Sequence, residues 1–184
     1  MAVPMPHRRF TVDEYHRMGE AGILGPYDRV ELIAGEIVTM SPIGGRHMGR
    51  VNTLSNLLVG LVGRDALVST QKPIRLANDG EPQPDIALLR HDASKDAVPT
   101  PDDVILVIEV ADSSLDYDRN VKLPLYAAAG IPEAWLVNLP GEMIERYSDP
   151  RDGIYRLIAR ARRGETLAST VLPALVLPID AALG

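Results

Sequence analysis

An uninterrupted apolar run with a single acid in it places the tightest constraint on the fold. The stretch Val104–Val110 shows no alternation of polar and apolar residues, which predicts a central β-strand covered on both faces. Its only polar residue is Glu109. A second acid, Asp85, lies at the start of another apolar stretch, Pro84–Leu89. A carboxylate in such a place costs several kcal/mol of desolvation unless a cation or hydrogen-bond donors offset that cost.

These two acids are expected to lie side by side. One polar loop, from about His91 to Asp103, connects their strands, so the strands should pair antiparallel. Directly opposed residues in such a pair have Cβ atoms about 4.5–5.5 Å apart. Two carboxylates at that separation can share Mg²⁺ or Mn²⁺, and without an ion their like charges would raise one pKa. The structural alternative is that Asp85 caps a turn and Glu109 pairs with an arginine.

A lysine is expected close to the two acids. Lys122 falls on the helix that follows the Glu109 strand, with Tyr126 one turn further on the same face. A lysine beside a phosphate can orient or activate water and offset developing negative charge. Two acids and a lysine are the minimal set for metal-assisted phosphodiester hydrolysis. On spacing alone, an exposed helix lysine without a role is an equal alternative.

The N-terminal half predicts a helix, a hairpin and a second helix. Val12–Glu20 should be helical after a capping box. Two short strands around the turn Ala34–Gly35 predict a β-hairpin that places Glu31 and Glu36 on one face. The stretch Arg46–Val62 has apolar residues at helical spacing. Ala66–Thr70 and Pro73–Leu76 are expected to form a strand or a strand pair.

The C-terminal half predicts a parallel crossover and a second hairpin. The Glu109 strand, a helix reaching about Ala129 and a strand over Glu133–Leu139 form a right-handed βαβ unit. Pro124 means that this helix either begins near Lys122 or is kinked. Met143–Ser148 and Ile154–Arg160 predict an antiparallel hairpin. We therefore expect an α/β fold in which helices flank a mixed central sheet and both hairpins extend that sheet.

Composition and charge exclude several classes of function. The 184 residues fit a single domain over 1–184, and 46% hydrophobic and 24% charged residues are ordinary for a soluble protein. The absence of cysteine excludes disulfides, thiolate zinc sites and cysteine nucleophiles. No apolar run is long enough for a signal peptide or membrane span, so a cytoplasmic location is expected. The net charge of −6 argues against tight non-specific DNA binding, but it allows a nuclease whose acidic site is neutralised by metal.

Several short motifs resemble one family over nearly the whole chain. They lie at Glu31–Glu36, Met40–Pro42, Gly45–His47, Tyr117–Ala127 and Ala129–Val137. Together they are similar to the Uma-type branch of the PD-(D/E)XK superfamily of restriction-endonuclease-like proteins. In that superfamily a strand beginning Pro-Asp precedes a strand carrying Glu-X-Lys. This chain has Pro84–Asp85 and then Glu109–Ala111, with Ala111 in the lysine position.

The resemblance implies a restriction-endonuclease-like fold and a Mg²⁺- or Mn²⁺-dependent endonuclease that acts on DNA. It implies Asp85 and Glu109 as metal ligands, with the Val110 carbonyl as a further ligand. The catalytic lysine of this branch lies on the following helix, which corresponds to Lys122. Glu31 matches a family acid near the same cleft. A homodimer is expected because one small site cuts one strand.

Three further side chains are candidates of second rank, and two other functions remain open. His47 begins the long helix and could contact a phosphate, Glu36 shares the face of Glu31, and Tyr126 follows Lys122. A catalytically silent nuclease-fold interaction module is favoured by Ala111 and by the acidic surface. Metal-dependent hydrolysis of a small phosphoester would explain the lack of a basic surface.

Overall fold

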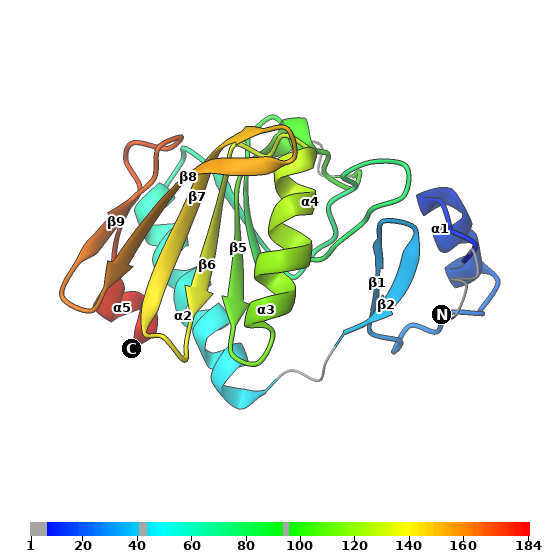
Figure 1. Cartoon of the computed structure of the whole chain (residues 1–184), viewed down its shortest axis with the longest axis horizontal. Coiled ribbons are helices and arrows are strands. Elements are labelled where there is room, and N and C mark those ends of the chain that lie inside the picture. The colour runs from blue at the N-terminus through cyan, green and yellow to red at the C-terminus, as the bar shows by residue number, and fades with distance from the viewer. Residues whose placement is uncertain (1–6, 41–43, 94–95) are drawn as a thin grey trace, which may run out of the picture.

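A six-stranded mixed sheet forms the centre of the protein (Figure 1). The computed structural model describes residues 7–40, 44–93 and 96–184, so the Ser41 and Pro42 positions of one motif lie outside the described residues. The strand order is β3–β4–β5–β6–β7–β8. These strands are β3 (Leu67–Thr70), β4 (Ile86–Leu89), β5 (Val104–Ala111), β6 (Glu133–Asn138), β7 (Met143–Arg151) and β8 (Ile154–Arg162).

Strand β5 has the central position that its apolar run predicts. It pairs antiparallel with β4 and parallel with β6, which confirms the βαβ crossover. Alternate side chains face opposite layers: Leu106, Ile108 and Val110 join one core cluster, whereas Val107 joins the other. Glu109 lies two residues after Val107, so its side chain points to the same face of the sheet.

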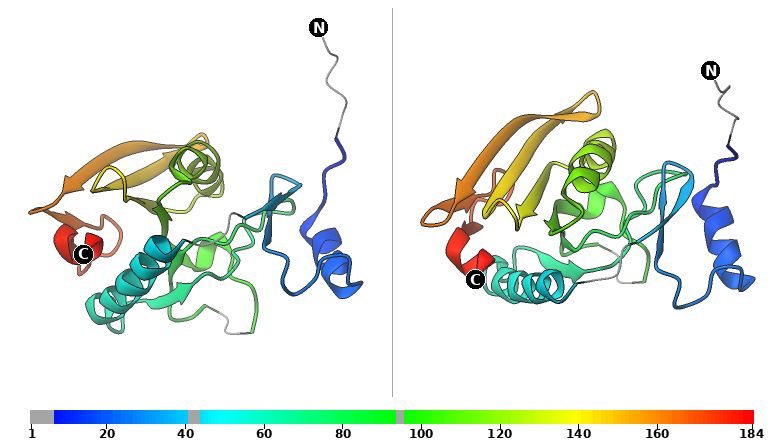
Figure 2. Two further views of the ribbon diagram at one scale, coloured as in Figure 1. Left: turned by 90° about the horizontal axis from the view of Figure 1, so that it is seen from below. Right: turned by 60° about the horizontal axis from the view of Figure 1, so that its bottom comes forward.

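Helices cover both faces of the sheet (Figure 2). Helix α2 (Gly45–Val62) packs its apolar stripe on one face together with the C-terminal helix α5 (Ile179–Leu183). A small sheet of β9 (Thr166–Ala168) and β10 (Val176–Pro178) completes that layer. Helix α4 (Leu123–Ala128) covers the other face through Leu123, Tyr126 and Ala127.

The helical segment before β6 accommodates Pro124 with a widened turn. Helix α3 (Leu115–Tyr117) continues into the π-helical turn η2 (Asp118–Lys122) and then into α4. In a regular α-helix the proline ring would clash with the carbonyl of Asn120. The wider turn, in which the Leu123 N–H donates to the Asp118 carbonyl, relieves that clash. The helical segment therefore begins at Leu115. One of the two interpretations of Pro124 placed its start near Lys122, several residues too late.

The N-terminal hairpin does not extend the central sheet, which corrects our expectation. Strands β1 (Val30–Ile33) and β2 (Glu36–Thr39) form a separate two-stranded sheet. Their backbone partners come from the 78–83 segment instead: the Glu81 N–H donates to the Leu32 carbonyl at 2.8 Å, and the Gly35 N–H donates to the Asp79 carbonyl. Helix α1 (Val12–Glu20), with its expected capping box, lies beyond this hairpin (Figure 1). The C-terminal hairpin β7–β8 does extend the sheet.

Pro73–Leu76 forms no strand, because its backbone bonds to neighbouring turns. The Ile74 N–H donates to the Pro82 carbonyl, and the Arg75 N–H donates to the Pro99 carbonyl. The short 3₁₀ turn η1 (Pro101–Asp103) then leads into β5. Within the described ranges, no helix combines the length and the apolar character needed to cross a membrane.

A buried acid, Glu133, ties the C-terminal segment to the sheet and offers a test of the fold. Its carboxyl group accepts hydrogen bonds from Trp135 Nε1 at 2.7 Å and from both the N–H and the hydroxyl of Thr170. Thr170→Val should lower the free energy of unfolding in urea by about 2 kcal/mol, because one donor to a buried acid is lost. Thr166→Val, at another exposed threonine for which no such bond is seen, should change it by less than about 0.5 kcal/mol. Equal effects of the two substitutions would contradict this assignment.

Candidate active site

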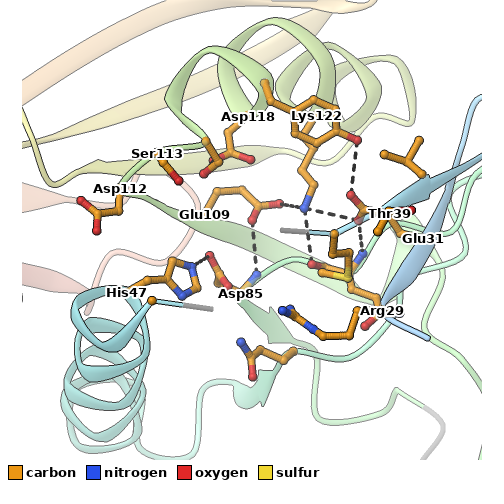
Figure 3. Close-up of a pocket in the computed structure, with 17 residues that line it drawn as sticks. Arg29, Glu31, Thr39, His47, Asp85, Glu109, Asp112, Ser113, Asp118 and Lys122 are labelled. Carbon is orange, nitrogen blue, oxygen red and sulfur yellow. Dashed lines mark hydrogen bonds and ion pairs between the residues drawn. The ribbon is translucent and has the colours of Figure 1, made fainter. Parts of the chain in front are cut away.

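A cleft of about 640 Å³ opens where β5 ends, beside the N-terminus of α2, the β1–β2 hairpin and the α3–η2 segment (Figure 3). Its ionisable lining consists mainly of carboxylates. Five acids and three basic side chains line it: Glu31, Asp85, Glu109, Asp112 and Asp118, with Arg29, His47 and Lys122. Such an excess of negative charge favours a cation as occupant.

Asp85 and Glu109 lie against each other, as their spacing predicts. Because Ile86 opposes Ile108 in the β4–β5 ladder, Asp85 opposes Glu109. The Asp85 N–H donates to Glu109 Oε2 at 3.4 Å, and the Val110 N–H donates to Asp85 Oδ2 at 2.8 Å. The structure thus brings both acids to one side of the cleft.

Glu109 is almost completely buried and is held mainly at one oxygen. Tyr126 donates its hydroxyl to Oε1 at 2.5 Å, and Lys122 Nζ lies 3.3 Å from the same atom. Burial raises the pKa of Glu109 to about 8, although the charge of Lys122 opposes that rise. Asp118 and Asp85 add to the rise through their negative charges.

Lys122 is buried in the cleft, which excludes the alternative of an exposed helix lysine. Its ammonium group lies between two carboxylates, 3.3 Å from Glu109 Oε1 and 3.4 Å from Glu31 Oε2. Burial alone would lower the pKa of Lys122, but the negative charges of Glu109 and Glu31 outweigh that effect and raise the pKa. The side chain is therefore a permanent cation at neutral pH.

Glu31 reaches the cleft from the separate hairpin, whereas Glu36 does not. Glu31 is buried and accepts from the Gln83 N–H at 3.1 Å and from the Tyr117 hydroxyl at 3.3 Å, besides pairing with Lys122. Glu36 is exposed on β2 and is absent from the cleft lining. The shared strand face is therefore not enough to bring Glu36 to the site.

The π-helical turn aligns three side chains on the two glutamates. Tyr117 contacts Glu31, Tyr126 contacts Glu109, and Lys122 contacts both. Five residues of a regular α-helix would leave Tyr117 and Lys122 about 140° apart around the axis. The extra residue of η2 brings them onto one face. Tyr117 was not identified as a site residue from the sequence. The signal that could have indicated it is Pro124, a proline inside a helical pattern.

Asp118 was also missed. Its side chain is buried, accepts a hydrogen bond from the Ser114 hydroxyl at 2.5 Å and lines the cleft. Burial raises the pKa of Asp118, while the hydrogen bond from Ser114 and the charge of Lys122 oppose that rise. Asp118 therefore adds to the negative charge that the cleft concentrates around Lys122.

The first turn of α2 is attached to the residue before β4 and to the residue after β5. His47 Nε2 lies 2.9 Å from Asp85 Oδ2, so this second-rank candidate does lie in the cleft. Its hydrogen bond with Asp85 raises the pKa of His47, although burial opposes that rise. Arg46 bonds to Asp112 Oδ1 and to the Leu139 carbonyl, each at 3.1 Å.

The two acids fit a divalent cation. Among the described residues no group of three or more His, Cys, Asp or Glu side chains is arranged to hold an ion. Mg²⁺, however, is commonly bound through one or two carboxylates, with water and substrate oxygens completing its shell. Asp85 is held through Oδ2, and Glu109 is held mainly through Oε1. Each acid thus has a second oxygen, Oδ1 or Oε2, that the strong contacts do not use.

The raised pKa of Glu109 predicts a pH-dependent stability in metal-free buffer. The folded protein keeps the proton up to about pH 8, whereas an unfolded glutamate releases it near 4.5. Stabilisation from this proton is complete below pH 4.5 and disappears as the pH rises through 8. Over that window the free energy of unfolding in EDTA should fall by up to about 1.4 kcal/mol per pH unit from this group.

Glu109→Gln should remove this contribution and flatten the pH profile, as measured by urea unfolding between pH 5 and 9. Glu36→Gln changes an exposed glutamate outside the cleft and should keep the wild-type profile. Identical profiles for wild type and Glu109→Gln would show that Glu109 does not carry the proton.

Comparison with known proteins identifies the fold and the family. The fold matches the crystal structure of "a putative nuclease belonging to DUF820" from Anabaena variabilis with a TM-score of 0.73, covering 95% of this chain and 97% of that one at 15% identity. That likeness confirms the expected restriction-endonuclease-like fold. No curated protein matches the chain. Residues 12–180 match the Uma2 family, described as "Putative restriction endonuclease". Family and fold together support a nuclease, and the chain belongs to the Uma2 family.

Proposed function

We propose that this protein is a divalent-metal-dependent endonuclease that hydrolyses phosphodiester bonds in DNA. One observation carries the proposal: two opposed carboxylates, Asp85 and Glu109, share an acidic cleft with the buried cation Lys122. Burying this many charges costs stability that an apolar cluster of the same volume would not. Such a cost is typical of functional sites.

Asp85 and Glu109 would hold the cation, with the Val110 carbonyl as a further ligand. Restriction-endonuclease-like proteins generally use divalent cations. When bound, the ion supplies Lewis-acid polarisation of the phosphate and lowers the pKa of an attacking water. The protein contributes the fixed positions of the two carboxylates, which the β4–β5 ladder sets.

Lys122 would stabilise negative charge on the phosphate and would not act as a base. Its raised pKa leaves no lone pair to accept a proton at neutral pH. Glu31 holds the ammonium group from the side opposite Glu109, so the lysine keeps one partner if Glu109 turns to a metal ion. Ala111, in the place of the superfamily lysine, is fully buried beside α4, and the helix supplies the amine instead.

The acidity of the cleft favours a second candidate, hydrolysis of a small phosphoester. Five carboxylates repel a long polyanion more than they repel a single phosphodiester. The third function, a silent interaction module, requires only the fold. Supercoiled plasmid and bis(p-nitrophenyl) phosphate, tested in parallel, distinguish the three functions. A nuclease cleaves the plasmid, a small-phosphoester hydrolase acts only on the small diester, and a silent module acts on neither.

The decisive experiment is plasmid cleavage with Mg²⁺ or Mn²⁺. Wild type should nick and linearise plasmid. Asp85→Asn, Glu109→Gln and Lys122→Met should each slow cleavage at least about 100-fold. The first two weaken the hold on the cation, and the third removes the positive charge beside the phosphate. Glu36→Gln should cleave at the wild-type rate. Cleavage by Asp85→Asn as fast as wild type would refute the metal-dependent nuclease, and turnover of the small diester alone would favour the second candidate.

We further propose that residues 1–184 form one nuclease domain and that it acts as a homodimer. A single small site cuts one strand, so a double-strand cut in one binding event needs two copies. Sedimentation equilibrium at micromolar concentration, with and without a DNA duplex, measures the assembly directly.

A further inference from the structure

We infer that His47 is a positioning residue that fixes Asp85 as a metal ligand through a hydrogen bond from its Nε2. This inference rests on the proposed function, because it assigns a role around the same cation. In Figure 3 the ring of His47 extends from the first turn of α2 toward Asp85. Nε2 lies 2.9 Å from Asp85 Oδ2.

Two donors from different elements hold the same oxygen. The Val110 N–H of β5 donates to Asp85 Oδ2 at 2.8 Å, and His47 approaches the same atom from α2. Neither of these donors uses Oδ1. Because the backbone donor and the imidazole donor converge on Oδ2, they restrain rotation of the carboxylate and leave Oδ1 for a metal ion in the cleft that Asp85 lines. Such outer-shell partners orient a ligand and tune its affinity for the metal.

The chemistry of the pair fixes the tautomer of the ring. An ionised carboxylate only accepts hydrogen bonds, so Nε2 must carry the proton. The other nitrogen, Nδ1, is buried and has no hydrogen-bond partner among residues 7–40, 44–93 and 96–184. Within those residues the only polar contact of the ring is therefore with Asp85. In the described part of the chain, the ring therefore joins no wider hydrogen-bond network.

The position of the helix does not depend on this ring. Arg46, the preceding residue, attaches the same turn to Asp112 and to the Leu139 carbonyl. Val51, Leu54 and Leu58 anchor the helix further along in the core. Changing the side chain of His47 should therefore alter Asp85 and leave α2 in place.

The chain contains a matched control for this contact. His16 Nε2 lies 2.9 Å from the buried carboxylate of Glu81, the same distance as in the His47–Asp85 pair. Neither His16 nor Glu81 lines the cleft. Loss of a histidine–carboxylate pair outside the cleft should leave metal affinity unchanged, whereas loss of the pair at His47 should weaken it.

Calorimetric titration of the metal-free protein with Mn²⁺ tests the inference without any activity measurement. His47→Ala should weaken Mn²⁺ binding by about 10–100-fold, the usual effect of losing an outer-shell partner. His47→Gln should stay within about threefold of wild type, because its amide N–H can reach the position of Nε2. His47→Asn carries the same amide one methylene shorter and should bind as weakly as the alanine variant. His16→Ala should bind like wild type.

Three results would overturn the inference: wild-type affinity in His47→Ala, equal weakness in the Gln and Asn variants, or no Mn²⁺ binding by wild type at millimolar concentration. If His47→Ala does not fold, as judged by urea unfolding, the contrast between Gln and Asn still decides. Failure of the nuclease proposal is distinguishable. If Mn²⁺ binding depends on His47 but the protein leaves plasmid intact, the nuclease proposal fails and the positioning role of His47 stands.

Discussion

The ammonium group of Lys122 lies between Glu31 and Glu109, and these two contacts connect three separate elements of the protein. Glu31 belongs to a hairpin outside the central sheet, Glu109 to the central strand β5, and Lys122 to the π-helical turn. All three side chains are almost fully buried. Removal of the lysine would leave two buried acids without their common cation, a loss that typically costs about 3–5 kcal/mol. The site and the docking of the hairpin therefore depend on the same ion pairs.

The π-helical turn makes this arrangement possible. A regular helix could direct Lys122 and Tyr126 at β5, since they are four residues apart, but Tyr117 would then face elsewhere. The inserted residue lets one helical segment contact Glu109 through Tyr126 and Glu31 through Tyr117. Pro124 favours the wide turn because it cannot fit the regular one without a clash. Pro124, a residue type that usually ends helices, therefore determines which side chains of this helical segment face the cleft.

Local patterns in the sequence were enough to predict much of this protein. The apolar run around Glu109 gave the central strand, and the single loop between the strands gave the antiparallel register that opposes Asp85 to Glu109. The central strand and its register both follow from local sequence pattern and from the pairing of adjacent strands. The docking of the hairpin was not predictable in this way, because its partners lie in an irregular segment, 78–83, that has no periodic signal. Tyr117 and Asp118 were missed for a related reason: their faces depend on a turn type that residue spacing does not specify.

Protons and metal would compete for the same carboxylate in this cleft. Without an ion, five acids lie in the same cleft as Lys122 and Arg29, and Glu109 retains its proton toward pH 8. A divalent ion beside Asp85 and Glu109 would release that proton, since a ligating carboxylate must be ionised. The bound ion would also cancel two of the charges that repel a phosphodiester. The overall charge of −6 is then compatible with an anionic substrate, because the local charge around the reacting phosphate would be set by the ion and Lys122.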